Sequence, residues 1–321
     1  MTELPSGWTT RRPTLDDIPA ILEVVHASDI AAVGEPDFTS DEVREELIAP
    51  NTDLDRDSWL ALDPSGKIVA WAYPYNGTGR ARDMANVYFW PEIGLPALRP
   101  LLAMLMERIA ERAREFGHEV YEVRSGAIPG EDHLIAALTD AGFTFLKQFA
   151  RMQMSLEGCS PVAPEPPAGV TVRAVDSGDE AEMRRFHAVI EEAFRDSDHP
   201  AMGYDGWRAQ FESESSLSFD EWLVAEVDGE IAGVLQSADG SGDTEEGYVK
   251  YLATLRGFRR RGVGEALLRR AFAVYAAKGR PKAGLGVDLA NPTDAASLYF
   301  KVGMTPLYRA NVYRTEIKAA G

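Results

Sequence analysis

The residues best suited to chemistry in this chain form an arginine- and glycine-rich turn, T-L-R-G-F-R-R-R-G-V-G-E-A-L-L at 254–268. The turn lies between a predicted strand and a predicted helix, and Gly262 and Gly264 fall where the helix begins. A helix N-terminus presents unpaired backbone N–H groups and a partial positive charge, and glycine lets an anion approach that backbone closely. The three arginines at 259–261 add full charges. This pattern predicts a site for a phosphate or pyrophosphate group, and therefore a phosphorylated cofactor.

Length and composition limit the class of protein to which this site belongs. The chain has 321 residues, enough for two domains, with 45% hydrophobic and 26% charged residues, as in ordinary soluble globular proteins. Its net charge of -18 disfavours nucleic acid and anionic membranes as partners, because both need a basic face. We expect a cytoplasmic protein for two reasons. The chain has a single cysteine, Cys159, and the sequence shows neither an apolar signal core nor an apolar run of membrane length.

The elements that must position the turn occur twice along the chain. Similar segments recur in the same order at a nearly constant offset, which indicates duplication of one domain of ~150 residues. A proline-rich stretch at 157–168 separates the copies and is typical of an extended linker. We therefore expect domains at 1–156 and 169–321. The matched pairs are 7–11 with 169–173, 59–60 with 222–223, Gly66 with Gly229, and 141–144 with 302–305.

Each copy is expected to contain a strand, an amphipathic helix, a hairpin, a central strand, a long helix, a strand, a shorter helix and a terminal strand pair. This order predicts an α/β fold, that is, a mixed α+β sheet with helices packed on its faces. In the first copy the named elements are expected at 8–12, 15–27, 59–72, 84–90, 97–116, 119–124 and 131–141. In the second they are expected at 170–174, 178–194, 222–236, 246–254, 263–278, 284–288 and 293–302.

The second copy resembles an acetyltransferase domain of the GNAT superfamily. Residues 259–264, R-R-R-G-V-G, fit that family's Q/R-x-x-G-x-G/A pyrophosphate loop. Residues 285–304 fit its second signature, N…A…L-Y-x-x-x-G-F/M. The duplication is similar to that of tandem GNAT proteins of the mycothiol synthase type, so the resemblance implies two GNAT-like domains, of which only residues 170–317 carry the motifs.

The resemblance implies acetyl-CoA as co-substrate and no metal. In GNAT enzymes coenzyme A lies in a V-shaped gap where the central strand splays from its neighbour. Its pantetheine arm pairs with that strand, and its pyrophosphate lies on the N–H groups of the loop. The residues that the resemblance assigns to the cofactor are Leu252, Ala253, Thr254, Arg259, Arg260, Arg261, Gly262, Val263, Gly264, Glu265 and Asn291.

Transfer of an acetyl group to an amine needs an oxyanion contact, a proton for the leaving thiolate and a base for the amine. A backbone N–H near Leu252–Thr254 can supply the oxyanion contact. The motif around Tyr299 implies that its phenol supplies the proton for the thiolate. Family bases often lie fourteen residues before the first loop glycine, where this chain has Tyr248. Glu246 points to the same strand face and is our candidate base; the alternative is a solvated glutamate at the start of a strand.

The first copy lacks these groups. At the repeat offset Gly262 corresponds to Pro100, which has no N–H donor, and Gly264 to Leu102. Tyr299 corresponds to Leu138. We therefore expect a degenerate, non-catalytic first domain that binds coenzyme A poorly or not at all.

The function expected from these observations is N-acetyl transfer to a small-molecule amine by the C-terminal domain. A non-catalytic acyl-CoA sensor or scaffold and transfer of a longer acyl group are the alternatives. Acceptor sites in this family are built from variable loops, here mainly 194–220. The candidates on that loop are Asp198, His199, Tyr204 and Trp207, whose acids and aromatic faces could hold a cationic amine or could pack against the first copy.

Overall fold

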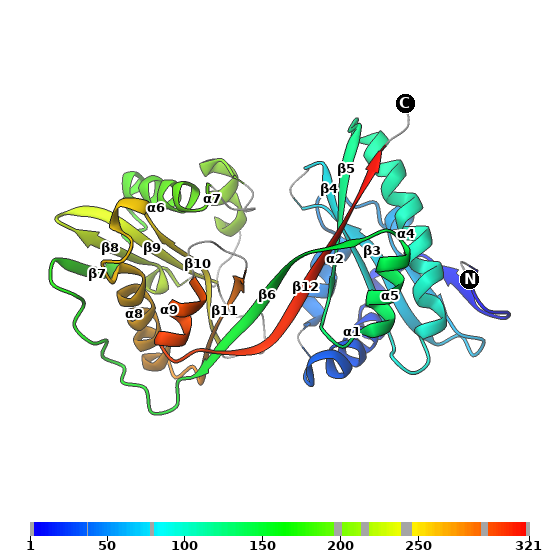
Figure 1. Ribbon diagram of the computed structural model, residues 1–321, viewed down its shortest axis with the longest axis horizontal. Helices are drawn as coiled ribbons and strands as arrows, with labels where there is room; N and C mark the ends of the chain where they lie inside the picture. Colours follow the sequence, from blue (N-terminus) through cyan, green and yellow to red (C-terminus); the bar gives the residue numbers. More distant parts are fainter. Residues whose placement is uncertain are drawn as a thin grey trace. The chain divides into compact units, whose positions relative to one another are not determined.

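The computed structural model describes residues 3–36, 38–77, 80–195, 201–212, 218–238, 246–289 and 295–318 (Figure 1). The chain forms two compact units, and the first of them is made of two separate segments. Unit 1 comprises Met1–Phe149 with Tyr308–Gly321, and unit 2 comprises Ala150–Leu307. No helix within the described ranges is long and apolar enough to cross a membrane.

Unit 1 is a six-stranded sheet in the order β1-β2-β3-β4-β5-β12. β4 and β5 are parallel, and the neighbouring pairs β1–β2, β2–β3, β3–β4 and β5–β12 are antiparallel. The strands are β1 (Thr9–Arg11), β2 (Trp59–Leu62), β3 (Ile68–Tyr75), β4 (Arg82–Phe89), β5 (Val120–Ala127) and β12 (Thr305–Lys318). The helices are η1 (Leu15–Asp17), α1 (Ile18–Val33), α2 (Ser40–Leu47), α3 (Leu54–Asp57), α4 (Leu95–Glu115) and α5 (Asp132–Asp140).

Unit 2 repeats this plan in the order β6-β11-β10-β9-β8-β7, with β10 and β11 parallel. Its strands are β6 (Thr144–Ser155), β7 (Val170–Ala174), β8 (Leu223–Val227), β9 (Glu230–Ala238), β10 (Glu246–Thr254) and β11 (Lys282–Asp288). Its helices are α6 (Glu180–Ala193), α7 (Tyr204–Glu212), η2 (Phe219–Glu221), η3 (Arg256–Phe258), α8 (Val263–Ala277) and α9 (Ala295–Lys301).

The last strand of each half completes the sheet of the other unit. β12 pairs antiparallel with β5, from Asn311 opposite Ala127 to Lys318 opposite Val120. Residues 150–155 of β6 lie beside β11 in unit 2. The expected terminal strand pair is therefore one long strand in each half, and the compact units differ from the expected domains 1–156 and 169–321. Sequence similarity shows which segments are copies of each other. It does not show which sheet a final strand joins, because two similar sheet edges offer either strand the same hydrogen bonds.

Two apolar layers enclose the sheet of unit 2. One layer lies between the sheet and α8 and includes Leu267, Ala271 and Val249. The other lies under α6 and α7 and includes Phe186, Trp207 and Ala253. A shift of register between Val249 and Tyr251 sets the alternation of β10, so that Tyr251 and Ala253 face α6.

Candidate functional site

The central strand of unit 2 separates from its parallel neighbour partway along its length. β10 pairs with β11 over Glu246–Val249 only, and within the described residues the parallel register goes no further. On its other edge β10 stays paired with β9 as far as Thr254. The backbone groups of residues 250–254 that face β11 are therefore left for a ligand, in the V-shaped gap that the resemblance implied.

The loop after β10 is shaped to present backbone N–H groups at the start of α8. Arg260 and Gly262 both have left-handed backbone conformations, with φ of 62° and 79°. Left-handed residues in a turn aim successive N–H groups at one point, which forms a nest for an anion. A non-glycine residue in this conformation costs ~1–3 kcal/mol, and such strain concentrates at functional sites. The loop therefore has the backbone geometry of a phosphate site.

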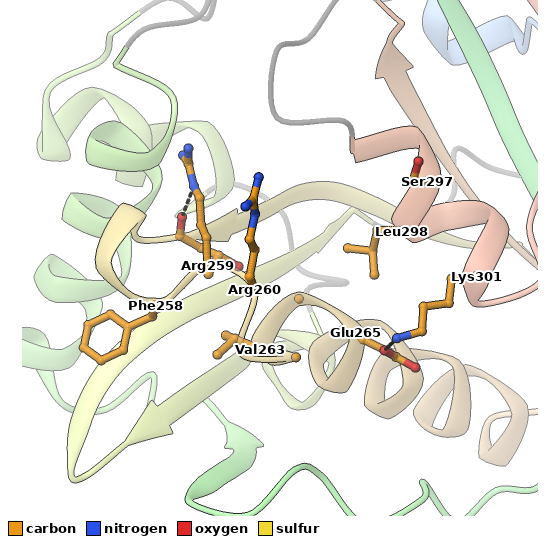
Figure 2. Close-up of a pocket in the computed structure, with 11 residues that line it drawn as sticks. Phe258, Arg259, Arg260, Val263, Glu265, Ser297, Leu298 and Lys301 are labelled. Carbon is orange, nitrogen blue, oxygen red and sulfur yellow. Dashed lines mark hydrogen bonds and ion pairs between the residues drawn. The ribbon is translucent and has the colours of Figure 1, made fainter.

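A cavity of about 360 Å³ lies against this loop and the start of α8 (Figure 2). Its wall comes from the end of β10, the loop, the first turn of α8 and one face of α9. The lining residues are Thr254, Phe258, Arg259, Arg260, Gly262, Val263, Gly264, Glu265, Ser297, Leu298 and Lys301.

The three loop arginines have different surroundings. Figure 2 shows the Arg259 and Arg260 side chains extending from the loop. Arg259 donates to the carbonyl oxygens of Thr254 at 3.3 Å and Ala193 at 3.4 Å, so it fixes the loop. Arg261 does not line the cavity; it lies near Asp228 and over the Phe258 ring. Arg260 has no ion pair or hydrogen bond within the described ranges, which leaves its charge available to a ligand.

A second basic residue borders the cavity from α9. Lys301 Nζ lies 2.5 Å from Glu265 Oε2, and Arg269 Nε lies 3.0 Å from Glu265 Oε1. These contacts lower the pKa of Glu265 and fix its carboxylate in the first turn of α8. Sequence reasoning missed Lys301, Ser297 and Leu298; the spacing of Leu298 and Lys301, three residues apart, would have placed them on one helix face.

Tyr299 lies in the buried layer beside α8, with 7% of its surface exposed. It does not line the cavity, although Leu298 and Lys301 beside it do. Burial raises its pKa to about 12, which keeps the phenol protonated at neutral pH. A protonated phenol can donate a proton to a thiolate, as the predicted role requires.

Glu246 takes part in a polar cluster that spans three strands. Its carboxylate forms an ion pair with Arg151 of β6 and accepts a hydrogen bond from Gln153 at 3.0 Å. The Arg151 guanidinium also stacks over Tyr248, with its Cζ 4.6 Å from the ring centre. Gly284 of β11 leaves room for this cluster, since a Cβ there would lie 2.3 Å from Glu246 Oε1. The structure thus brings both strand-face candidates together but also ties the carboxylate to a cation.

The remaining residues that the sequence assigned to the cofactor or to the acceptor lie in different parts of unit 2 or outside the described residues. Leu252 packs on the α8 side of the sheet, and Ala253 is buried on the α6 side. Asn291, Asp198 and His199 lie outside the described residues. The two aromatic residues of the predicted acceptor loop belong to unit 2 itself: Trp207 is buried and its indole N–H donates to Gln236 Oε1 at 3.2 Å, and the Tyr204 hydroxyl donates to Glu180 Oε2 at 3.1 Å.

The corresponding loop of unit 1 differs in length and packing. The connection from β4 to α4 is three residues shorter than that from β10 to α8, and α4 begins at Leu95. Pro100 and Leu102 therefore lie inside α4, not at its N-terminus as the repeat offset suggested. Gly94 precedes the helix, and a Cβ there would lie 2.2 Å from the carbonyl oxygen of Val69. The backbone at the start of α4 is therefore packed directly against the backbone of β3.

Three comparisons agree with this geometry. Residues 183–304 match the Acetyltransferase (GNAT) family. A mycothiol acetyltransferase of Streptomyces avermitilis is 29% identical over 224 residues, which cover 68% of this chain and 66% of that protein's length. The crystal structure of a GCN5-related N-acetyltransferase from Sphaerobacter thermophilus is 26% identical, with 98% of both chains covered and a TM-score of 0.85.

Residues 183–304, which lie in unit 2, therefore match the GNAT family of acetyltransferases, and the chain as a whole is similar to acetyltransferases of that family. Its tandem fold is also that of a tandem GNAT protein from the clavulanic acid biosynthesis pathway. That structure is 15% identical, covers 98% of this chain and 99% of its own, and has a TM-score of 0.68. Within the described residues no cluster of three or more His, Cys, Asp or Glu side chains could hold a metal ion.

Proposed function

We propose that this protein transfers an acetyl group from acetyl-CoA to the amine of a small molecule, with the chemistry in unit 2. The observation that carries the proposal is the cavity of about 360 Å³ beside the separated end of β10. It joins a phosphate-binding loop to an unpaired strand edge, which are the two surfaces that coenzyme A needs. A relative named mycothiol acetyltransferase supports a small-molecule acceptor.

The cavity fits the phosphorylated part of coenzyme A in three respects. The backbone N–H groups at 260–264 converge at a helix N-terminus, where a negative charge is favourable. Arg260 adds a charge that no described residue neutralises. Gly264 lets the ligand approach closely, since a Cβ there would already be 3.1 Å from Leu298 Cδ2. The pantetheine arm would pair with residues 252–254.

The side chains of unit 2 supply the proton movements of the transfer. As the new C–N bond forms and the C–S bond breaks, the amine loses a proton and the thiolate must gain one. Tyr299 is the proposed donor, because its phenol is protonated at neutral pH and lies on α9 beside two residues that line the cavity. A backbone N–H of residues 252–254 would stabilise the carbonyl oxygen as it becomes negative.

Glu246 is the proposed base, and its ion pair with Arg151 constrains how it can act. Arg151 holds the Glu246 carboxylate and the Tyr248 ring in place, so Glu246 would act on the amine through a water molecule. The test is steady-state kinetics: Glu246→Gln should lower kcat/KM for the amine and leave the affinity for acetyl-CoA unchanged. A kcat/KM equal to that of the unmodified protein would show that Glu246 is structural.

The second candidate function is a non-catalytic acyl-CoA sensor, which the ion-paired state of Glu246 favours. Thiol release from acetyl-CoA with a panel of amines separates the two functions. An acetyltransferase releases thiol with at least one amine and loses that activity in Tyr299→Phe. A sensor binds acetyl-CoA with the same affinity in both proteins and turns over no amine.

A further inference from the structure

The proline-rich segment at 157–168, which joins the two halves of the chain, is fixed to unit 2 where it begins. The whole segment belongs to that unit, and Figure 1 shows it as the irregular stretch between β6 and β7. Leu156, just before the segment, is buried in the layer between the sheet and α8, and its N–H donates to the Pro281 carbonyl oxygen at 2.7 Å. Cys159 packs on the same layer. The segment is therefore not a free tether at this end.

The other end of the segment is fixed by a turn that leads into β7. The N–H of Val170, the first residue of that strand, donates to the Pro167 carbonyl oxygen at 2.9 Å. Gly169 within the turn has a φ of 80°, which glycine adopts without strain. Val170 itself is buried and pairs with Val227 of β8. The pairing of β7 in the sheet therefore determines where Pro167 lies.

Pro167 contacts the phosphate loop at the residue that begins α8. A Cβ built on Gly262 would lie 2.7 Å from Pro167 Cγ and 3.7 Å from its Cβ and its Cδ. Gly262 lines the cavity of about 360 Å³, whereas Pro167 does not. The proline ring therefore supports the loop from outside the cavity.

The two residues in this contact differ in backbone freedom. Glycine populates left-handed and right-handed conformations about equally readily, so the φ of 79° at Gly262 is one of several open to it. That conformation orients the N–H groups at the start of α8. Pro167 has a φ fixed by its own ring and also restricts Pro166 before it to extended conformations. A rigid residue thus limits the motion of a flexible one, and a loop ordered before binding costs less free energy to occupy.

We propose that the segment at 157–168 is part of the cofactor site, in which Pro167 is a positioning residue that holds Gly262 in the conformation that receives the phosphate groups. The inference rests on the proposed use of acetyl-CoA by unit 2 and extends it to the connection between the two halves. Because coupling between two equilibria is reciprocal, bound acetyl-CoA in turn strengthens the contact of Pro167 with the loop. Occupancy of the acetyl-transfer site is thereby transmitted to this connection.

The first test is calorimetric titration of the full chain with acetyl-CoA. Pro167→Gly removes the ring and its fixed φ, so the Kd should rise about fivefold or more, and the KM for acetyl-CoA should rise with it while kcat changes little. The matched control is Pro164→Gly, the same change at an exposed proline that is not among the atoms nearest to Gly262. Both variants add the same freedom to the unfolded chain, so their melting temperatures without ligand should be similar and only Pro167→Gly should lose affinity.

The second test is limited proteolysis with elastase, with mass spectrometry of the cut after Val162, which is 73% exposed. Cleavage requires the segment to open away from unit 2, so its rate reports how firmly the segment is held. Acetyl-CoA should slow this cut in the unmodified protein and in Pro164→Gly, and it should have little effect on the cut in Pro167→Gly.

Two outcomes would overturn the inference and leave the proposed function in place. They are an equal Kd for acetyl-CoA in the two variants, and a cut after Val162 whose rate in the unmodified protein does not depend on acetyl-CoA. Absence of acetyl-CoA binding by the unmodified protein would instead refute the proposed function, on which the inference rests.

Discussion

At the scale of single residues, two adjacent arginines of the phosphate loop differ in what they can do. Arg260 borders the cavity without a partner among the described residues, whereas Arg261 turns toward Asp228 and Phe258. We expect Arg260→Ala to raise the KM for acetyl-CoA about tenfold, because it loses a charge-assisted hydrogen bond to phosphate. Steady-state kinetics at low salt is the measurement. Arg261→Ala is the matched control, and an equal effect of both would contradict the assignment.

Tyr299→Phe removes a hydroxyl and keeps a buried ring. We expect kcat to fall about 100-fold or more, because the thiolate loses its proton donor. Binding of acetyl-CoA and the melting temperature should change little, since the ring volume is conserved. The pKa of about 12 also means that the phenol stays protonated below pH 11. Two results together would count against this role. They are a wild-type activity that declines around pH 9 and a Tyr299→Phe activity equal to that of the wild type at each pH.

Glu46 in unit 1 gives a prediction about stability and pH. Burial raises its pKa to about 7, and one carboxylate oxygen is buried without a hydrogen-bond partner. A raised folded-state pKa contributes stability below the ordinary pKa near 4.5, and that contribution is lost as the pH rises through 7. Glu46→Gln should therefore increase the free energy of unfolding by ~1–3 kcal/mol at pH 8 and have almost no effect at pH 4. Denaturant titrations at both values check this, and an equal effect at both would refute it.

At the scale of elements, the start of α8 depends on one glycine. Gly262 has φ of 79°, and a Cβ on it would lie 2.7 Å from Pro167 Cγ. Gly262→Ala should lower the free energy of unfolding by ~1–3 kcal/mol and weaken acetyl-CoA binding, because the loop must shift. Gly257→Ala in η3 is the control, since a Cβ there meets nothing within 4 Å. Thermal melts with and without acetyl-CoA measure both effects, and equal melts for the two variants would disprove the prediction.

The sequence predicted the bounds of those helices and strands that are determined by local sequence pattern. The central strand at 246–254 has the predicted bounds, and the helix after the loop begins at Val263 as predicted. Gly262 comes directly before α8, so local chemistry determines where this helix begins. The helices at 40–47 and 204–212 were missed, because each is short and stability there comes from packing. Lys301 was missed for a related reason: only the fold brings α9 to the loop.

At the scale of the whole molecule, the exchange of final strands joins the stability of the two halves. Residues 169–321 alone lack β6, and with it Arg151, the ion-pair partner of Glu246. We expect this fragment to aggregate or melt below the full chain, because β11 would have an open edge and Glu246 an unpaired charge. Size-exclusion chromatography and thermal melts test this. A monomeric fragment with full activity would show that the exchanged strand is dispensable.

The exchanged strand also determines when the first unit can fold during synthesis. Domains usually fold in order as the chain leaves the ribosome, the N-terminal one first. Here β5 waits for β12, so unit 1 cannot complete its sheet until residues 308–318 have been translated and released. The half that is made first is thus finished last, and its nascent β5 edge needs protection, by a chaperone or by transient pairing with β6, while residues 128–318 are translated.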